Sequence, residues 1–483
     1  MDRRTFRFLF AGIVGIAISS AYHGDETPET ELQRLVRPFS TQQFVLLNVD
    51  ESFAFKLNNG DTRVIRLVSV QEHKDNVVKL MRRAEVRVEI DGKPLDLVSM
   101  PYVMPTETAG LRLQADTTSG YGNISKQVQL SLWDADDPIV DTKRFAFPIK
   151  NYRILSHGTQ AYNEPVHLGA GDDDPAGQLF CHDYGFDQGG FEGGETVLSP
   201  VQGKIVLFWP SREDLCSAVV QDRSGLNWEL CHLFSVESNI IMGAHVEKGQ
   251  KIGMLGKSGP SGNFSHLHLG TYLNMHDLEI DNRNRRLNFY PWLVAAYQAQ
   301  HPKGILAVAR PHHIVLTGEK VVLDGSNSLA WGGNKIVEWH WILPNGTAIK
   351  KSKAETSFDR PGAYVATLWV KDDQGNEDAD FCPVKVYTKE KPEKGIPHIY
   401  MTCTPTEDIR PNQPVRFRFW FQGAGGGPIQ VSFDDGTKME DYKQYSEFSH
   451  AFKKRGVHIV TAQCEDSGKP ISGKLKVIVT AAK

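Results

Sequence analysis

The sequence has few cysteines, little net charge and no long apolar run beyond its first residues. It contains 6 cysteines in 483 residues, and its 54 Lys and Arg nearly balance its 58 Asp and Glu, for a net charge of −4. This balance gives no whole-chain electrostatic reason to expect a nucleic-acid binder. After the N-terminus no apolar run approaches the ~20 residues that span a bilayer, so we expect no transmembrane span in the mature chain. The length suggests roughly three or four domains.

Residues 1–22 have the layout of a secretory signal peptide. Arginines near the start precede an apolar stretch at 8–18, and cleavage fits after Ala21. Residues 3–6 (RRTF) also resemble the twin-arginine export signal. An uncleaved membrane anchor is the alternative, although the apolar core is short for one. We expect an exported protein, located in the periplasm, the cell envelope or outside the cell.

Export makes disulfides permissible. Cys216 and Cys231 flank the turn-like stretch 222–227, so a hairpin centred there would place them opposite each other, close enough for a bridge to be considered. Cys403 and Cys464 could bridge two strands of the last domain. Connectivity cannot be deduced from sequence, and buried free thiols are the alternative for all the cysteines.

The chain divides into a signal peptide, a linker and a series of β domains. Short alternating runs such as residues 86–90, followed by the turn signal Asp91-Gly92, predict a β-sandwich after the linker. The best helix candidate is residues 286–300, with Pro302 as its stop. We expect an all-β multidomain protein with these segments: signal peptide 1–22, linker 23–43, N-terminal β-sandwich 44–150, glycine-punctuated β domain 151–280, helical connector 281–303, and two β-sandwich modules, 304–389 and 390–483.

The two C-terminal segments share landmarks with each other. The first carries, in order, residues 322–328 (VLDGSNS), 339–341 (WHW), 361–364 (PGAY) and 370–376 (VKDDQGN). The second keeps 433–436 (FDDG) and 449–452 (SHAF) but lacks the opening motif. Both resemble PKD (polycystic kidney disease) domains, which implies Ig-like sandwiches that act as non-catalytic spacers or adhesion modules with a protein or glycan partner. Generic Ig-like sandwiches are the alternative.

Ionisable residues that could carry chemistry concentrate between positions 181 and 270. His266 and His268 are two apart in a strand-like run, so they project from one face. Asp183 and Asp187 project together if their segment is extended, and His232 lies in another strand-like run. Each feature alone is more often structural. Together, two carboxylates and three imidazoles on β-strands fit a zinc site with an acid–base pair.

The order of motifs in this region resembles one known family. The motifs are residues 183–187 (DYGFD), 193–206 (GGETVLSPVQGKIV), 230–233 (LCHL), 246–253 (VEKGQKIG) and 265–269 (SHLHL). In this order and spacing they resemble the lysostaphin-type (LytM-like) peptidoglycan metallopeptidases. The resemblance implies an antiparallel β core of the duplicated-hybrid-motif type, flanked here by an N-terminal sandwich and two PKD-like sandwiches.

The resemblance also implies roles for individual residues. His268 and Asp187 would bind zinc, and His232 and His266 would be the catalytic histidines. The family has histidine at the first ligand position, where this chain has Asp183, with His182 one residue earlier. Asp183 could bind the metal directly, since carboxylate is an acceptable zinc ligand. Alternatively His182 could bind it, although a one-residue shift points a strand side chain to the opposite face, so a bulge would be needed.

Two functions of different classes remain open at this point. The resemblance implies an exported zinc metalloendopeptidase that uses a bound Zn²⁺ to hydrolyse peptide bonds, with peptidoglycan cross-links as the substrate. The alternative is a catalytically inactive metallopeptidase-fold protein that serves as a cell-envelope binding or adhesion module, because replacing one ligand can abolish a metal site.

Overall fold

A computed structural model shows a protein built almost entirely from β-strands. It describes residues 28–121, 124–153, 160–162, 165–167, 180–182, 185–211, 215–259, 261, 264–273, 287–392, 395–422, 428–442 and 446–480, to which the structural statements below refer. The expected signal peptide, residues 1–22, lies outside them. The described part has only two helices, α2 (Pro28–Val36) and α4 (Tyr290–Gln300), which confirms the all-β fold class.

The N-terminal domain consists of two antiparallel four-stranded sheets packed face to face. On β4, Ala84, Val86 and Val88 are buried whereas Glu85 and Arg87 are exposed, the alternation of a sheet with one face on a core. Buried side chains of both sheets form one cluster. The sheet orders are β1 (Gln43–Leu47), β8 (Val128–Asp134), β7 (Leu111–Thr118), β6 (Thr106–Thr108), and β2 (Ser52–Lys56), β3 (Thr62–Lys74), β4 (Met81–Ile90), β5 (Lys93–Ser99).

The central domain holds a seven-stranded sheet and a smaller three-stranded sheet. The chain passes from the large sheet to the small one at His232, between β16 and β17. The large sheet has the order β18 (His245–Val246), β14 (Gly203–Ser211), β15 (Leu215–Asp222), β16 (Asn227–Cys231), β20 (His266–Tyr272), β12 (Phe186–Gly189), β9 (Gln160–Tyr162). The small sheet has the order β13 (Thr196–Leu198), β19 (Lys251–Leu255), β17 (Leu233–Val236), and β10 (Pro165–His167) pairs with β11 (Phe180–His182).

Part of the segment for which the sequence predicts a linker, residues 23–43, forms helix α2. Leu32, Leu35, Val36 and Phe39 are buried in the same cluster as the central domain. The spacing of Leu32, Leu35 and Val36 by three and four residues places them on one helical face, and Phe39 follows in the turn after the helix. The apolar stripe is so short that the polar residues around it mask the pattern in the sequence.

Helix α4 lies within the core rather than on a surface connector. The Trp292 ring centroid lies 5.9 Å from that of Phe39 and 6.3 Å from that of Trp228. Its indole N–H donates a hydrogen bond to Gln42 Oε1 at 3.2 Å. The helix therefore joins the central domain to the segment just before the N-terminal domain.

The two C-terminal modules share one sheet, whereas the sequence predicts two separate sandwiches. β28 of the first module pairs in parallel with β36 of the second, with Ala363 opposite Ile471. Across this seam Lys476 Nζ lies 2.7 Å from Asp378 Oδ1, and both side chains are almost fully buried. The pairing joins strands far apart in sequence, so no local pattern predicts it.

The strands of the modules are as follows. The shared sheet has the order β22 (His313–Leu316), β29 (Glu377–Tyr387), β28 (Gly362–Asp372), β36 (Lys469–Val479), β35 (Gly456–Asp466), β32 (Ile429–Phe433), β33 (Lys438–Tyr442), and β25 (Ile336–Ile342) and β26 (Ala348–Ile349) branch from β28. The smaller sheets are β21 (Gly304–Leu306) with β24 (Leu329–Trp331), β23 (Val321–Asp324) with β27 (Lys353–Thr356), and β30 (His398–Thr404), β31 (Val415–Gln422), β34 (Glu447–His450).

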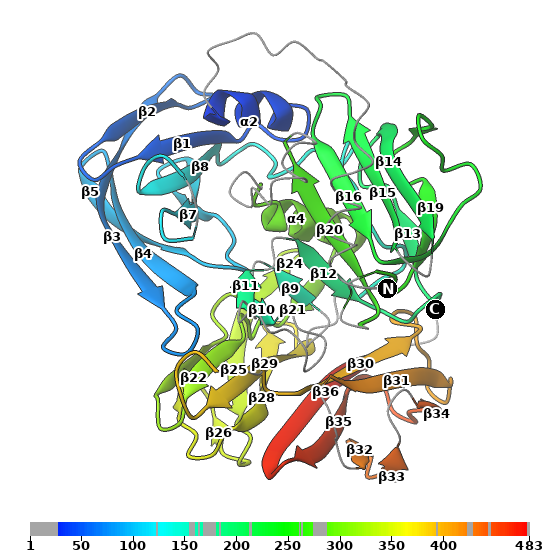
Figure 1. Cartoon of the computed structure of the whole chain (residues 1–483). Coiled ribbons are helices and arrows are strands. Elements are labelled where there is room, and N and C mark those ends of the chain that lie inside the picture. Colours follow the sequence, from blue (N-terminus) through cyan, green and yellow to red (C-terminus); the bar gives the residue numbers. More distant parts are fainter. Residues whose placement is uncertain are drawn as a thin grey trace.

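The domains form two tiers (Figure 1). The N-terminal and central domains lie side by side above the two modules. The first module contacts the N-terminal domain, where Asn76 Nδ2 donates to Glu319 Oε1 at 2.8 Å. The second module contacts the central domain, where Arg418 Nη1 donates to Glu192 Oε2 at 2.9 Å. None of the described helices is long and apolar enough to cross a membrane.

Of the alternatives that the sequence leaves open for the cysteines, the structure shows free thiols at those it describes. The free cysteines among the described residues are Cys216, Cys231, Cys382, Cys403 and Cys464. In the hairpin of β15 and β16, Ala218 lies opposite Leu230, so Cys216 is one residue out of register with Cys231. Because a shift of one residue points a side chain to the opposite face, these two sulfurs cannot meet.

Candidate metal centre

The candidate site lies where β12 and β20 run side by side in the large sheet. The strands are antiparallel, and Asp187 lies directly opposite His268. His266 is two residues before His268 on β20 and therefore shares its face. Leu267 and Leu269 point the other way and are fully buried. Their burial fixes the register of β20, and with it the face on which the histidines lie.

Three side chains converge closely enough to share one metal ion. One ligand atom from each of Asp187, His266 and His268 lies within 4.8 Å of the other two. Asp187 Oδ1 is 2.8 Å from His268 Nδ1 and 3.5 Å from His266 Nε2. Imidazole nitrogen and carboxylate oxygen are the ligands that zinc takes alongside cysteine. The donor set therefore fits zinc.

His232 joins this group from the end of β16. Its backbone φ is 63°, in the left-handed region, which costs a residue with a Cβ about 1–2 kcal/mol. Such strain gathers at functional sites. Here it turns the chain from one sheet into the other and brings the imidazole centroid to 4.6 Å from that of His266 and 6.0 Å from that of His268.

Backbone carbonyls fix the protons on two of the imidazoles. Nδ1 of His232 lies 2.7 Å from the carbonyl oxygen of Ser258, and Nδ1 of His266 lies 2.8 Å from that of Phe264. Because a carbonyl only accepts hydrogen bonds, each Nδ1 carries the hydrogen and each ring has its lone pair at Nε2. Both rings can therefore take a proton, or a metal, at Nε2.

The electrostatics keep His232 neutral. Burial first, and then the neighbouring His266 and His268, lower the pKa of His232 to about 3. At neutral pH the ring is therefore an acceptor at Nε2. It can donate from that atom only after it has taken up a proton.

Gly185 gives His268 its space. A Cβ at position 185 would lie 2.5 Å from His268 Nε2, far inside van der Waals contact. Any side chain here would displace the imidazole from Asp187. The glycine within residues 183–187 is thus required by a close approach rather than by a turn.

The structure brings together most of the residues that the sequence predicts at the site. Those that meet are Asp187, His232, His266 and His268. Asp183 lies outside the described residues. His182 ends β11, whose described partner is β10 rather than β12, and its side chain is not among those described. The choice between Asp183 and His182 stays a prediction.

Two aromatic residues at the site were not singled out from the sequence. Phe264 stacks on His266, with ring centroids 4.6 Å apart and planes 16° apart. Tyr400, on β30 of the second module, stacks on Phe264 at 4.8 Å and 21°. Phe264 could have been noticed because it directly precedes the SHLHL run. Tyr400 carries no local signal, since only the domain arrangement brings it here.

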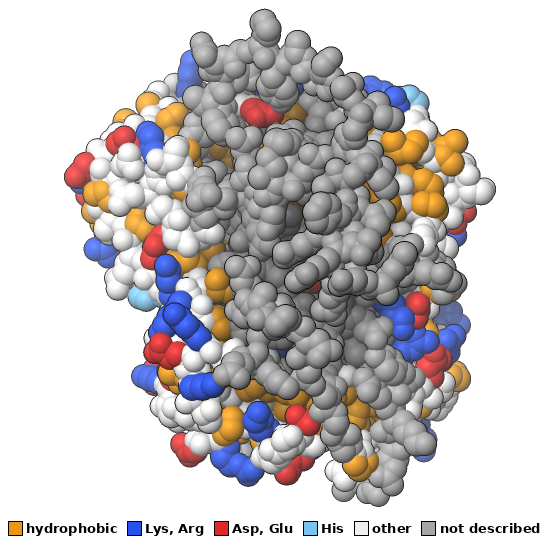
Figure 2. All heavy atoms as spheres, in the orientation of Figure 1, with side chains coloured by type: hydrophobic (Ala, Val, Ile, Leu, Met, Phe, Trp, Pro, Cys, Tyr) orange, Lys and Arg blue, Asp and Glu red, His pale blue; other side chains and the backbone are white. Residues whose placement is uncertain are grey.

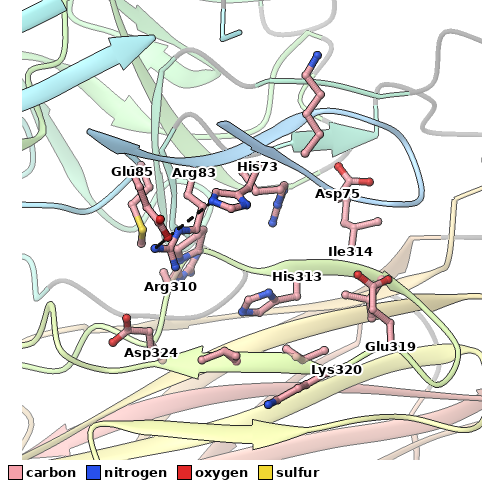
Figure 3. Close-up of a pocket in the computed structure, with 18 residues that line it drawn as sticks. His73, Asp75, Arg83, Glu85, Arg310, His313, Ile314, Glu319, Lys320 and Asp324 are labelled. Carbon is pink, nitrogen blue, oxygen red and sulfur yellow. Dashed lines mark hydrogen bonds and ion pairs between the residues drawn. The ribbon is translucent and has the colours of Figure 1, made fainter. Parts of the chain in front are cut away.

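A cavity of about 330 Å³ lies elsewhere, between the N-terminal domain and the first module. Figure 3 shows His73 and Arg83 entering it from β3 and β4, and His313 and Lys320 from the module. The described residues that line it include none of the four that meet at the candidate metal centre. The cavity is therefore a feature of that domain junction and not of the site.

Comparison with known families bears on the first module. Residues 305–386 match the PKD domain family. The match confirms the PKD-like resemblance of this module, including its Ig-like sandwich. It covers about a sixth of the 483-residue chain and so says nothing about the metal centre.

Several solved structures resemble parts of the chain. A protein described as a candidate glycyl-glycine endopeptidase lytM from Ruminococcus gnavus is 23% identical over 32% of this chain and 61% of its own, with a TM-score of 0.23. The alignment thus spans about three fifths of that structure. Lysostaphin from Staphylococcus simulans is 17% identical over 51% and 94%, with a TM-score of 0.24. A zinc containing peptidase from Vibrio cholerae is 15% identical over 46% and 81%, with a TM-score of 0.22. TM-scores of this size support no functional assignment.

Proposed function

We propose that the protein is an exported zinc metalloendopeptidase that hydrolyses peptide bonds, with peptidoglycan cross-links as its substrate class. The observation that carries the proposal is the convergence of Asp187, His266 and His268 within 4.8 Å, beside a third histidine, His232, that is held neutral. The motifs around these residues resemble those of lysostaphin-type peptidases. Export is inferred from residues 1–22, and the PKD-like modules would contact a protein or glycan of the envelope.

Different residues of the site would bind the metal and transfer the proton. Asp187 and His268 would hold the ion together with Asp183 or His182. When bound, zinc supplies a Lewis acid that polarises a carbonyl and acidifies water. His232 accepts a proton at Nε2 and can then donate it to the leaving amine. Its Nδ1–H stays bonded to the Ser258 carbonyl throughout, so the ring keeps its orientation.

His266, whose ring centroid lies 4.6 Å from that of His232, offers a second such group. Its Nδ1–H is bonded to the Phe264 carbonyl, so a proton taken up at Nε2 makes it a donor toward the site. A preorganised donor of this kind stabilises the negative charge that develops on a scissile carbonyl oxygen. The pair thus offers one group for proton transfer and one for charge stabilisation.

Metal content and cell-wall hydrolysis test the proposal together. The purified mature protein should hold close to one zinc per chain by elemental analysis and release new amino termini from purified cell wall. His268→Ala should lose both metal and activity. His232→Ala should keep the metal and lose activity by about 100-fold or more. Metal loss in only one of Asp183→Ala and His182→Ala would identify the remaining ligand.

Two results would contradict this function. One is full hydrolysis by a metal-stripped sample. The other is the absence of metal from every sample even after zinc is added and the excess removed. The second result would favour a catalytically inactive fold that binds the cell envelope, and retention of the protein on purified cell wall without release of amino termini would support that role.

A further inference from the structure

A continuous stack of rings connects the second module to the candidate site. Tyr400 stacks on Phe264, and Phe264 stacks on His266, with centroid distances of 4.8 and 4.6 Å. Aromatic pairs of this geometry attract each other beyond the effect of their buried area, so the stack favours one ring orientation over another.

His266 depends on Phe264 in two ways. Its Nδ1–H donates to the Phe264 carbonyl at 2.8 Å, and its ring lies against the Phe264 ring. Phe264 itself lies just before β20 begins at His266, outside the strand ladder. A backbone hydrogen bond to the Ser261 carbonyl, at 3.1 Å, holds it from the loop side. Whatever fixes the Phe264 side chain therefore also fixes the His266 ring.

Tyr400 is well placed to do this because its strand is clamped to the central domain. Arg418 on the neighbouring strand β31 pairs with Glu192 at 2.9 Å. Thr404, at the end of β30, forms a side-chain hydrogen bond with the buried Glu195. These contacts hold the sheet that carries Tyr400 at a fixed place beside the site.

We propose that Tyr400 is a positioning residue of the peptidase site, which acts through Phe264 on His266. The second PKD-like module is then a structural part of the catalytic unit and not a detachable spacer. This inference rests on the proposed function, and it assigns a role in the reaction to a domain that carries none of the metal-site residues.

Substitutions at Tyr400 in the full-length protein test the proposal. Tyr400→Phe keeps the stacking ring and should lose much less kcat than Tyr400→Ala. Tyr400→Ala should lower kcat by about tenfold or more, with KM within about twofold and zinc content unchanged, because the histidine is misoriented while substrate binding persists. Tyr400→Leu, which keeps apolar bulk, should lose kcat in the same way and serves if the alanine variant unfolds.

The matched control is Tyr364→Ala. Tyr364 lies against Phe358 in the first module, with centroids 4.5 Å apart and planes tilted by 32°. The substitution therefore removes a close aromatic pair far from the site. It should leave kcat unchanged. A loss of kcat equal to that of Tyr400→Ala would mean that general destabilisation explains both, and would overturn the proposal.

A spectroscopic readout separates this inference from the proposed function. The face of Phe264 should shift the ring protons of His266 upfield in the NMR spectrum of a histidine-labelled chain, with the signal assigned through His266→Gln. The shift should persist in Tyr400→Phe and vanish in Tyr400→Ala, whether or not the wild type is active. An unchanged shift in Tyr400→Ala, or a rise in its activity, would overturn the positioning role. A shift that behaves as expected in an inactive wild type would leave the ring stack standing and reject only the peptidase function.

Discussion

The two junctions between the upper and lower tiers are built from different chemistry. The site junction, between the central domain and the second module, contains the Tyr400–Phe264 ring pair, the Arg418–Glu192 ion pair and the buried Glu195. Burial raises the pKa of Glu195 to about 8, against the opposing effect of hydrogen bonds from the Phe191 backbone N–H and from Thr404. This junction therefore holds a buried acid in its neutral form.

The basic junction, between the N-terminal domain and the first module, surrounds the cavity and contains buried bases. Arg82 donates to the carbonyl of His312 across it. Burial lowers the pKa of His313 to about 3, and burial and then Arg82 take the pKa of His312 well below its usual value. Lys and Arg side chains gather on this side of the face seen in Figure 2, below the N-terminal domain.

The contrast shows that the domain junctions of one chain can contain buried groups whose contributions to stability change in opposite directions with pH. The acid destabilises the site junction as pH rises, and the bases destabilise the basic junction as pH falls. Only the site junction touches residues with proposed chemistry. Changes there should alter catalysis, whereas changes at the basic junction should alter stability alone.

The largest expected effect concerns the contact between the two modules, where β28 pairs with β36 and Lys476 pairs with Asp378. This contact connects the two junctions. Lys476→Met leaves Asp378 buried without its cation, which typically costs about 3–5 kcal/mol in the free energy of unfolding. Denaturant unfolding measures it. The matched control is Lys353→Met at the exposed pair with Asp324, for which we expect less than about 1 kcal/mol. Equal losses of unfolding free energy in the two variants would mean that the buried Lys476–Asp378 pair does not stabilise the contact between the modules.

Glu195→Gln tests the buried neutral acid of the site junction. In the unfolded chain a glutamate ionises above about pH 4.3, whereas in the native state Glu195 stays protonated up to about pH 8. Native stability should therefore fall between these values, by about 3 kcal/mol at pH 7. Gln mimics the protonated acid, so the variant should lack this slope in Tm measured from pH 5 to 8. A wild-type Tm that does not fall over this range would contradict the buried neutral acid.

His313→Gln tests the opposite slope. The native histidine stays neutral down to about pH 3, while the unfolded residue binds a proton below about pH 6.5. Stability is therefore lost as pH falls from about 6.5 toward 3, by up to about 2 kcal/mol at pH 5. The variant should lose part of this dependence and leave peptide hydrolysis at neutral pH unchanged. Reduced hydrolysis would contradict the prediction that changes at the basic junction affect stability and not catalysis.

The smallest expected effect concerns Arg418. Its ion pair with Glu192 is mostly shielded from water, so Arg418→Gln should destabilise the protein by about 1 kcal/mol. The exposed Arg87–Asp96 pair provides the control, and Arg87→Gln should change stability by less than about 0.5 kcal/mol. Arg418 also pairs with Glu447 within its own sheet, so the difference in Tm between the two variants measures the combined loss of both pairs.

The sequence carried the local parts of the site. The alternation of polar and apolar residues predicted that His266 and His268 share one face of a strand. Leucines occupy the other, buried face of that strand, which fixes its register and places His268 opposite Asp187. The first PKD-like module was predicted from its resemblance to the PKD family, which rests on motifs within one segment, and the family match confirms it.

The parts that the sequence did not reveal depend on contacts between distant segments. Tyr400 meets Phe264 only because two domains dock, and Ala363 meets Ile471 only because two modules share a sheet. The possible pairing of Cys216 with Cys231, which the sequence leaves open beside free thiols, is excluded by one residue of hairpin register. Turn residues locate a hairpin in the sequence, but its register depends on packing as well.

The shared sheet has a geometric consequence. Because β28 and β36 belong to one sheet and the second module is clamped beside the site, the first module cannot swing on a tether. Under the proposed function, an envelope polymer bound by the first module would lie at a fixed distance from His266. The rigid tandem would then set how far from the point of attachment a bond is cleaved.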